Sequence, residues 1–169
     1  MNTLQWLAQQ EDGLSAIPAV ETKAMMEFSL LWAYFEARLL RSEASGRSIV
    51  RLAEHLAADS TTNLEKLNEP LAYWRARYFH QGDFTHNFDA LLLRRADNVA
   101  VVQAVLNGQD NTPKSVLVCL LTIIYRFRNN LFHGMKWAYG LRGQAGNFER
   151  ANNVLIAVSE MARSRPREA

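Results

Sequence analysis

Apolar residues recur along the chain at the spacing of α-helices. From Ala24 an apolar position returns every three or four residues as far as Leu39, which predicts one long amphipathic helix. Pro18 before this stretch and Gly46 after it fit the usual punctuation of a helix. No alternating pattern of useful strand length interrupts the chain. The periodicity therefore predicts an all-α fold, a helical bundle.

The same pattern and its punctuation place the remaining helices. They are expected as one helix capped by Ser48 and ending after Leu56, one opened by Pro70 and broken at Gly82, two short helices over 84–95 and 97–107, a long apolar helix from Pro113 to about His133, and a last helix from Phe148 to Ala162. Gly140, Gly143 and Gly146 mark a loose connection before that last helix.

Composition agrees with one globular domain. A chain of 169 residues that is 49% hydrophobic and 21% charged is long enough to bury a core. We expect the bundle over residues 18–163, preceded by an N-terminal segment (1–17) and followed by a basic tail (164–169). The single cysteine, Cys119, excludes a disulfide framework and a multi-cysteine zinc site.

Two features predict a cytoplasmic protein without a membrane segment. The N-terminal sequence MNTLQWLAQQEDG lacks the basic start and the apolar stretch of a signal peptide. The longest apolar run, residues 116–124, is far shorter than the roughly 20 residues that a membrane helix needs.

Charge is distributed unevenly along the chain. Residues 1–112 hold 10 Lys/Arg and 14 Asp/Glu, whereas residues 113–169 hold 9 Lys/Arg and 3 Asp/Glu. A basic final third is a modest indication of a polyanionic partner such as nucleic acid. The alternative interpretation is a solvated basic tail without a partner, because Arg163, Arg165 and Arg167 account for half of that excess.

Polar residues are concentrated at the end of the long apolar helix. The sequence YRFRNNLFHG places Arg126, Asn129, Asn130 and His133 three or four residues apart, hence on one helix face, while Phe132 and its apolar neighbours are free to serve the core. Arg128 precedes His133 by five residues, an offset of about 140° on a regular helix. The two side chains meet if the helix tightens or ends between them, or if a second chain faces the first.

These residue types suit a phosphodiester site. Histidine exchanges protons near neutral pH, and arginine binds phosphate and stabilises the charge that develops in a transition state. On RNA the 2′-hydroxyl is a built-in nucleophile, so no metal is required. The structural alternative is that His133 favours the helix dipole as a cation in the last turn, with Arg126 and Arg128 as surface charges.

The segment RNNLFHG resembles the motif of the HEPN superfamily, an Arg followed by a polar residue and then, after four to six intervening positions, a His. Arg128, Asn129 and His133 fill that pattern here. The stretch FSLLWAYFEARL, with Glu36 facing inward, is loosely similar to the first long helix of such domains. The resemblance covers about 15 residues around the motif, and it implies a HEPN-like all-α domain.

The resemblance also implies a function. It implies a metal-independent endoribonuclease without cofactor that cleaves single-stranded RNA as a two-fold homodimer, serving as a toxin or a phage-defence factor with a cognate antitoxin or defence-system partner. Arg128 and His133 would be catalytic and Asn129 would orient them. Arg126, Asn130 and Lys136 would contribute to RNA binding.

Other interpretations stay open. One is a catalytically silent HEPN-like module that binds RNA, a nucleotide or a protein partner. Another is a helical scaffold in which RNNLFH is coincidental, with Arg128 and His133 apart. His80, Asp83 and His86 are spaced like a loose metal site, but they surround Gly82 in an expected turn and have no evident fourth ligand, so we expect no metal.

Overall fold

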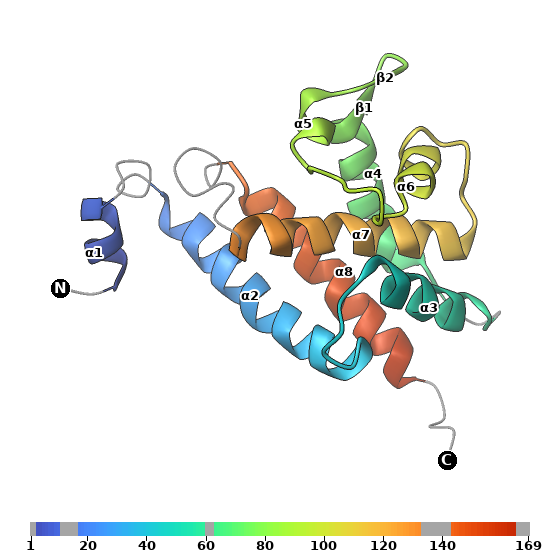
Figure 1. Cartoon of the computed structure of the whole chain (residues 1–169), viewed down its shortest axis with the longest axis horizontal. Helices are drawn as coiled ribbons and strands as arrows, with labels where there is room; N and C mark the ends of the chain where they lie inside the picture. Colours follow the sequence, from blue (N-terminus) through green and yellow to red (C-terminus); the bar gives the residue numbers. More distant parts are fainter. Residues whose placement is uncertain (1–2, 11–16, 60–62, 133–142, 165–169) are drawn as a thin grey trace.

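The computed structural model describes residues 3–10, 17–59, 63–132 and 143–164, and these residues are predominantly helical (Figure 1). The elements are α1 (Thr3–Gln10), α2 (Ala19–Leu39), α3 (Gly46–Ala57), the 3-10 turn η1 (Glu65–Leu67), α4 (Asn68–Tyr78), the strands β1 (Phe79–His80) and β2 (Asp83–Phe84), α5 (His86–Asp89), α6 (Val99–Leu106), α7 (Pro113–Phe132) and α8 (Ala145–Arg163). Within these ranges the strands form only a two-stranded antiparallel hairpin, so the expectation of an all-α fold is confirmed.

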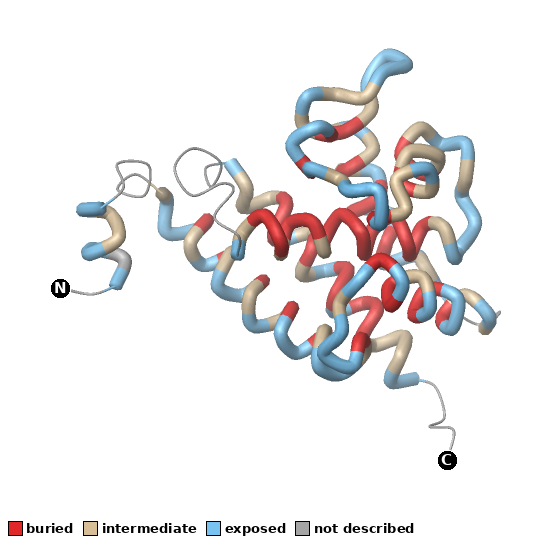
Figure 2. The backbone as a smooth tube through the Cα atoms, in the orientation of Figure 1, coloured by how far each residue is buried: buried red, intermediate tan, exposed pale blue. Residues whose placement is uncertain are grey.

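Helix α7 is the centre of the bundle. It begins at Pro113, as the Thr112-Pro113 pair predicts, and it packs against α3, α6 and α8. Figure 2 shows that burial is densest along this helix. Every residue from Val116 to Ile124 is buried, on all faces of the helix rather than along one stripe. Such a helix has to be enclosed by several neighbours.

By length and composition alone, α7 resembles a membrane span. It has 20 residues and is apolar enough to cross a bilayer, although its longest uninterrupted apolar run is short. In the fold, however, 72% of its most apolar window is buried against other helices. Burial of that kind is the pattern of a core helix in a soluble protein.

Helices α2 and α8 pack against each other along their lengths, although more than 100 residues separate them in sequence (Figure 1). The ring of Phe28 on α2 packs against that of Phe148 on α8, with the ring centres 5.0 Å apart. The starts of the two helices are tied as well, because the Gly143 amide donates a 2.6 Å hydrogen bond to the Glu21 carboxylate. Trp74 of α4 donates to Asn147 of α8 at 3.2 Å. The predicted long helix and last helix are thus confirmed, and they close the bundle.

Helix α2 ends without the predicted glycine. It stops at Leu39, and the Ser42 amide donates back to the Glu36 carbonyl at 3.0 Å. Arg41 and Ser42 both take the left-handed conformation, with φ of 53° and 60°. This conformation costs a residue other than glycine about 1 kcal/mol or more. The turn therefore holds Arg41 in a fixed position beyond the helix.

Gly46 has a different role from the predicted one, because it is the first residue of α3. The N-cap of α3 is Ser45 rather than Ser48, which was the predicted cap. Ser45 and Ser48 form a reciprocal capping box in which each side chain accepts the other's backbone N–H. Both serines satisfy the cap pattern in the sequence, and the geometry assigns Ser48 to the third helical position.

The region around the hairpin is less helical than predicted. Only His86–Asp89 forms a helical turn in the stretch 84–95, and the rest is an irregular loop. Leu92 and Asn98 in this region both have positive φ, which a continuing helix does not allow. The neighbouring prediction is confirmed, because α6 ends before Gly108, a glycine with φ of 82°.

We predict that Gly46→Ala lowers the free energy of unfolding by about 2 kcal/mol. A Cβ at Gly46 would collide with the backbone carbonyl oxygen of Ala96, which has no freedom to rotate away. Chemical denaturation of the two proteins measures the difference.

Gly146→Ala is the matched control. The added Cβ would meet only the ends of the Arg150 and Tyr73 side chains, both at 3.3 Å. These ends can move, and alanine favours the helix, so the stability should stay within about 0.5 kcal/mol. Equal losses in the two variants would contradict the proposed close contact at Gly46.

Candidate functional site

The polar cluster that the sequence places near His133 lies at the C-terminal end of α7. Three of its side chains are buried, namely Arg126, Asn129 and Asn130, whereas Arg128 is partly exposed. The predicted core role of Phe132 is wrong, because this ring is exposed at the end of α7. At this end of α7, three polar side chains are therefore buried and an aromatic ring is exposed.

Arg126 is a buried structural residue. Its side chain is 4% exposed; Nε donates to the Leu91 carbonyl at 3.1 Å, and Nη1 lies 3.5 Å from the Asp97 carboxylate. Burial lowers the pKa of the Arg126 guanidinium from its usual value, and the charge of Asp97 opposes that shift. Through these two contacts the guanidinium of Arg126 holds the 91–97 loop against α7.

Asn130 belongs to the same buried network. Its amide nitrogen donates to the Leu91 carbonyl at 3.3 Å, and its oxygen lies 3.5 Å from Arg126 Nη2. Direct RNA contact, which the sequence predicts for Arg126 and Asn130, would require both side chains to leave these partners. An unpaired buried charge is costly, so the network favours a structural role for both residues.

Arg128 has different surroundings from Arg126, although only two residues separate them. Two positions along a helix correspond to a rotation of about 200°, which turns Arg128 toward α2. Its side chain is 30% exposed, and Nη2 lies 3.8 Å from the Glu36 carboxylate of α2. Nη1 donates to the amide oxygen of Asn129 at 3.0 Å, and the guanidinium lies 5.7 Å from the centre of the Phe132 ring.

The donors of Arg128 are incompletely satisfied. Its Nε is buried and has no hydrogen-bond partner, and its ion pair with Glu36 is long. A guanidinium carries five N–H donors, so Arg128 retains donors for a further acceptor. Two oxygens of a phosphate ester can accept the paired N–H groups of a guanidinium, so a phosphate suits that geometry.

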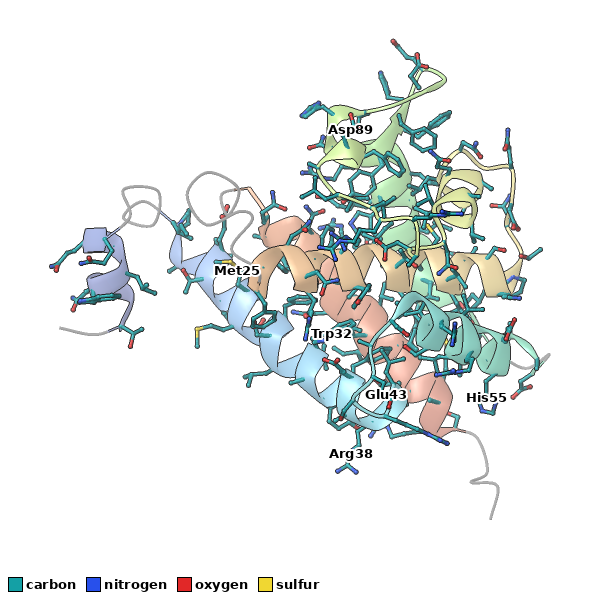
Figure 3. All side chains as sticks on the ribbon, viewed as in Figure 1. Met25, Trp32, Arg38, Glu43, His55 and Asp89 are labelled. Atoms are coloured by element: carbon teal, nitrogen blue, oxygen red, sulfur yellow. The ribbon has the colours of Figure 1, made fainter. Side chains whose placement is uncertain are left out.

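Glu36 is fixed in place from its own helix. The indole N–H of Trp32, one turn earlier on α2, donates to the Glu36 carboxylate at 2.8 Å. Figure 3 labels Trp32 on α2, and its ring lies 6.1 Å from that of Tyr125 on α7. The sequence predicts that Glu36 faces inward; in the structure its side chain is partly buried and contacts Arg128 of α7.

The structure thus brings Arg128 and Asn129 together, and it adds Glu36. Two other predicted site residues, His133 and Lys136, lie outside the described residues, so their roles stay predictions. The sequence patterns do not indicate that Asp97 pairs with Arg126 in this cluster. Asp97 precedes Arg126 by 29 residues, in a segment where the hydrophobic pattern indicated a helix, so no local signal connects the two.

The other chemistry-bearing residues do not form a second reactive centre in the described ranges. Cys119 is fully buried, and burial raises the pKa of its thiol well above the usual range, which makes it unreactive. His80 and Asp83 lie in the hairpin and His86 begins α5. Across the described ranges, no group of three His, Cys, Asp or Glu side chains is placed to hold a metal.

Comparison of the chain with models of known protein families, with curated proteins and with solved structures gives no match. The HEPN resemblance therefore rests on the motif residues themselves.

We predict that Asp97→Ala lowers the free energy of unfolding by about 3–5 kcal/mol, because it leaves the Arg126 charge buried without its partner. Arg128→Gln should cost less than about 1 kcal/mol, since that ion pair is partly exposed and long. Urea unfolding of both variants tests this contrast. If the two variants lose equal stability, the division into a structural and an available arginine is wrong.

Proposed function

We propose that this protein is a metal-independent endoribonuclease of HEPN type that cleaves single-stranded RNA. The observation that carries the proposal is the state of Arg128. It is a partly exposed guanidinium with unsatisfied donors, at the end of a rigid core helix and five residues before His133. A toxin or phage-defence role in the cytoplasm, with an antitoxin or defence partner, is the corresponding biological proposal.

The reaction proposed is a transesterification within the RNA strand. The ribose 2′-oxygen attacks the adjacent phosphorus, its proton is removed, and the bond from phosphorus to the 5′-oxygen breaks. The leaving 5′-oxygen takes up a proton, which gives a 2′,3′-cyclic phosphate and a 5′-hydroxyl. His133 serves as general acid or base, and Arg128 stabilises the charge on the non-bridging oxygens. No metal or cofactor takes part.

Glu36 and Asn129 are positioning residues in this proposal. Without substrate, the Glu36 carboxylate and the Asn129 oxygen hold the guanidinium of Arg128. The Arg128–Glu36 contact is weak enough to yield to a phosphate, because a partly exposed pair at 3.8 Å contributes little energy. Asn129 is itself buried, so it fixes the orientation of the side chain of Arg128.

We further propose that two chains assemble a composite site through α2. The outer face of α2 presents Met26, Leu30 and Tyr34 at intervals of four residues, all exposed, with Leu30 at 74%. Around the helix, Glu36 lies between this apolar stripe and the buried one. In this proposal a second copy packs on the stripe and brings its own Arg128 and His133 to the Arg128 of the first copy.

The contact between Arg128 and Glu36 also favours a second candidate. An arginine already neutralised by a carboxylate suits a catalytically silent module that binds RNA, a nucleotide or a protein partner without turnover. Only activity separates this candidate from the nuclease.

We predict that the purified protein cleaves a fluorescent mixed-sequence RNA in excess EDTA and leaves 2′,3′-cyclic phosphate ends. Arg128→Gln should lower kcat/KM by about 10²–10³-fold through loss of transition-state stabilisation. His133→Ala should lower it by about 10²–10⁴-fold through loss of proton transfer. Rates and end groups are read by gel electrophoresis and mass spectrometry.

The controls are Arg163→Gln, an exposed arginine at the end of α8, and His80→Ala, an exposed histidine in the hairpin. Both should leave the cleavage rate unchanged. Cleavage that survives in Arg128→Gln and in His133→Ala, with both proteins folded, would sink the nuclease assignment. Absence of cleavage by the wild-type protein at high concentration would support the silent module.

We predict that Leu30→Glu converts the dimer to a monomer and reduces cleavage in proportion to the dimer lost, because it places a charge at the centre of the apolar stripe. Sedimentation velocity beside the cleavage assay tests this prediction. Arg163→Glu, an exposed change at the end of α8, is the control that should keep the dimer. A monomeric wild-type protein with full activity would contradict the composite site.

A further inference from the structure

A second cationic feature lies at the far end of α2. A cavity of about 400 Å³ opens between the last turn of α2 and the first half of α3. Its floor is apolar, formed by Leu39, Leu40 and Leu52, and its rim carries Arg41, Arg51 and His55. No carboxylate is among the residues that line it.

The two arginines of the rim are available for a ligand. Arg41 and Arg51 are exposed, and within the part of the chain that the structure describes neither forms an ion pair with a carboxylate. The nearest acidic side chain along α3, Glu54, is already paired with Lys114 at 2.7 Å. Because neither arginine is paired with a carboxylate, an anion between them can accept hydrogen bonds from both guanidiniums.

The local fold fixes this rim. Arg41 sits in the left-handed turn that ends α2, and Arg51 follows one turn after Arg47, a further exposed arginine on α3. In Figure 3 the side chains of Arg38 and His55 both point away from the body of the molecule. Two arginines thus border this opening, Arg41 and Arg51, although the first two-thirds of the sequence is acidic on balance.

The cavity lies on the same helix as the candidate site. Leu40, on its floor, follows Glu36 by four residues, and its amide donates to the Glu36 carbonyl at 3.1 Å. At 1.5 Å per residue, that is a separation of roughly 6 Å along α2. Glu36 in turn contacts Arg128. The residue that contacts Arg128 and the floor of the cavity are therefore about one helical turn apart along α2.

We propose that this cavity is a second RNA-binding subsite, in which Arg41 and Arg51 hold a backbone phosphate of the strand and the leucine floor receives the apolar face of its nucleoside. The inference rests on the proposed function, since it supplies the substrate strand with a second anchor beside the reacting phosphate. An apolar floor with a cationic rim matches a nucleotide unit, which has an apolar base face and an anionic phosphate. Because the rim is exposed, a strand enters it from the side with no lid to open.

The test separates binding from cleavage by using an RNA that cannot react. The probe is a fluorescent 12-nucleotide mixed-sequence RNA with 2′-O-methyl groups, which lacks the attacking hydroxyl. Its affinity for the full chain is measured by anisotropy from low to moderate salt, with wild type, Arg41→Gln/Arg51→Gln and the charge-matched control Lys23→Gln/Lys66→Gln, whose lysines are exposed and lie outside the cavity.

The Arg41→Gln/Arg51→Gln variant should bind about tenfold more weakly at low salt. The slope of log affinity against log salt should fall in magnitude by about 0.7, which corresponds to one phosphate contact on a single strand. The Lys23→Gln/Lys66→Gln control should bind like wild type. Unchanged affinity and slope in the arginine variant would overturn the proposal, even if the wild-type protein cleaves RNA.

Loss of binding in the arginine variant, with a wild type that never cleaves, would support the subsite while removing the nuclease. A free nucleotide, AMP, is tested as a ligand in the same three proteins. AMP binding that needs Arg41 and Arg51, without any such dependence for the RNA, would overturn the assignment to a strand.

A measurement on the wild-type chain guards against a variant that does not fold. Arginine-selective modification by phenylglyoxal, followed by mass spectrometry, should be slowed by the RNA at Arg41 and Arg51 but not at Arg163. Equal modification of Arg41 and Arg51 with and without bound RNA would contradict the subsite.

Discussion

The enclosure of α7 is the constraint on which the rest of the structure depends. Because this helix is buried on every side from Val116 to Ile124 and again at Arg126, a charge that it carries there needs a partner inside the protein. Arg126 meets this requirement with the Leu91 carbonyl and the Asp97 carboxylate. The irregular segment between α5 and α6 is consequently held against the core, and the end of α7 becomes a rigid platform for the residue that follows Arg126 by two positions.

Arg126 and Arg128, two residues apart at the end of α7, have different surroundings and different roles. The helical rotation between Arg126 and Arg128 turns one guanidinium into the core and the other toward α2 and solvent. The N–H groups of Arg126 bind residues of the fold, whereas Arg128 has an N–H group without a hydrogen-bond partner. The same rotation carries Arg128 to Glu36, so α2 contributes both a counter-charge beside the candidate site and, one turn further on, the floor of the cationic cavity.

The sequence predicts the fold better than it predicts the site. Periodicity locates α2, α4, α6, α7 and α8 because their apolar spacing and their Pro and Gly boundaries reflect the burial that forms them. It fails over residues 84–95, where Leu92 takes a left-handed conformation that no continuing helix allows, and it cannot choose between Ser45 and Ser48 as a cap. The buried role of Arg126 is invisible locally, because its partner Asp97 comes from another element. The core role predicted for Phe132 is wrong because apolar character alone does not show whether a neighbour covers the ring.

The pairing of α2 with α8 has a consequence for the order in which the chain is made. Helix α2 leaves the ribosome early, but the helix that covers it begins only at Ala145. Until then the apolar surface of α7 has no complete enclosure, and Glu36 has no settled position relative to Arg128. A nascent chain therefore lacks an assembled Arg128 site for most of its synthesis. If the proposed nuclease activity holds, the ribosome that makes this protein is shielded from it until α8 has emerged.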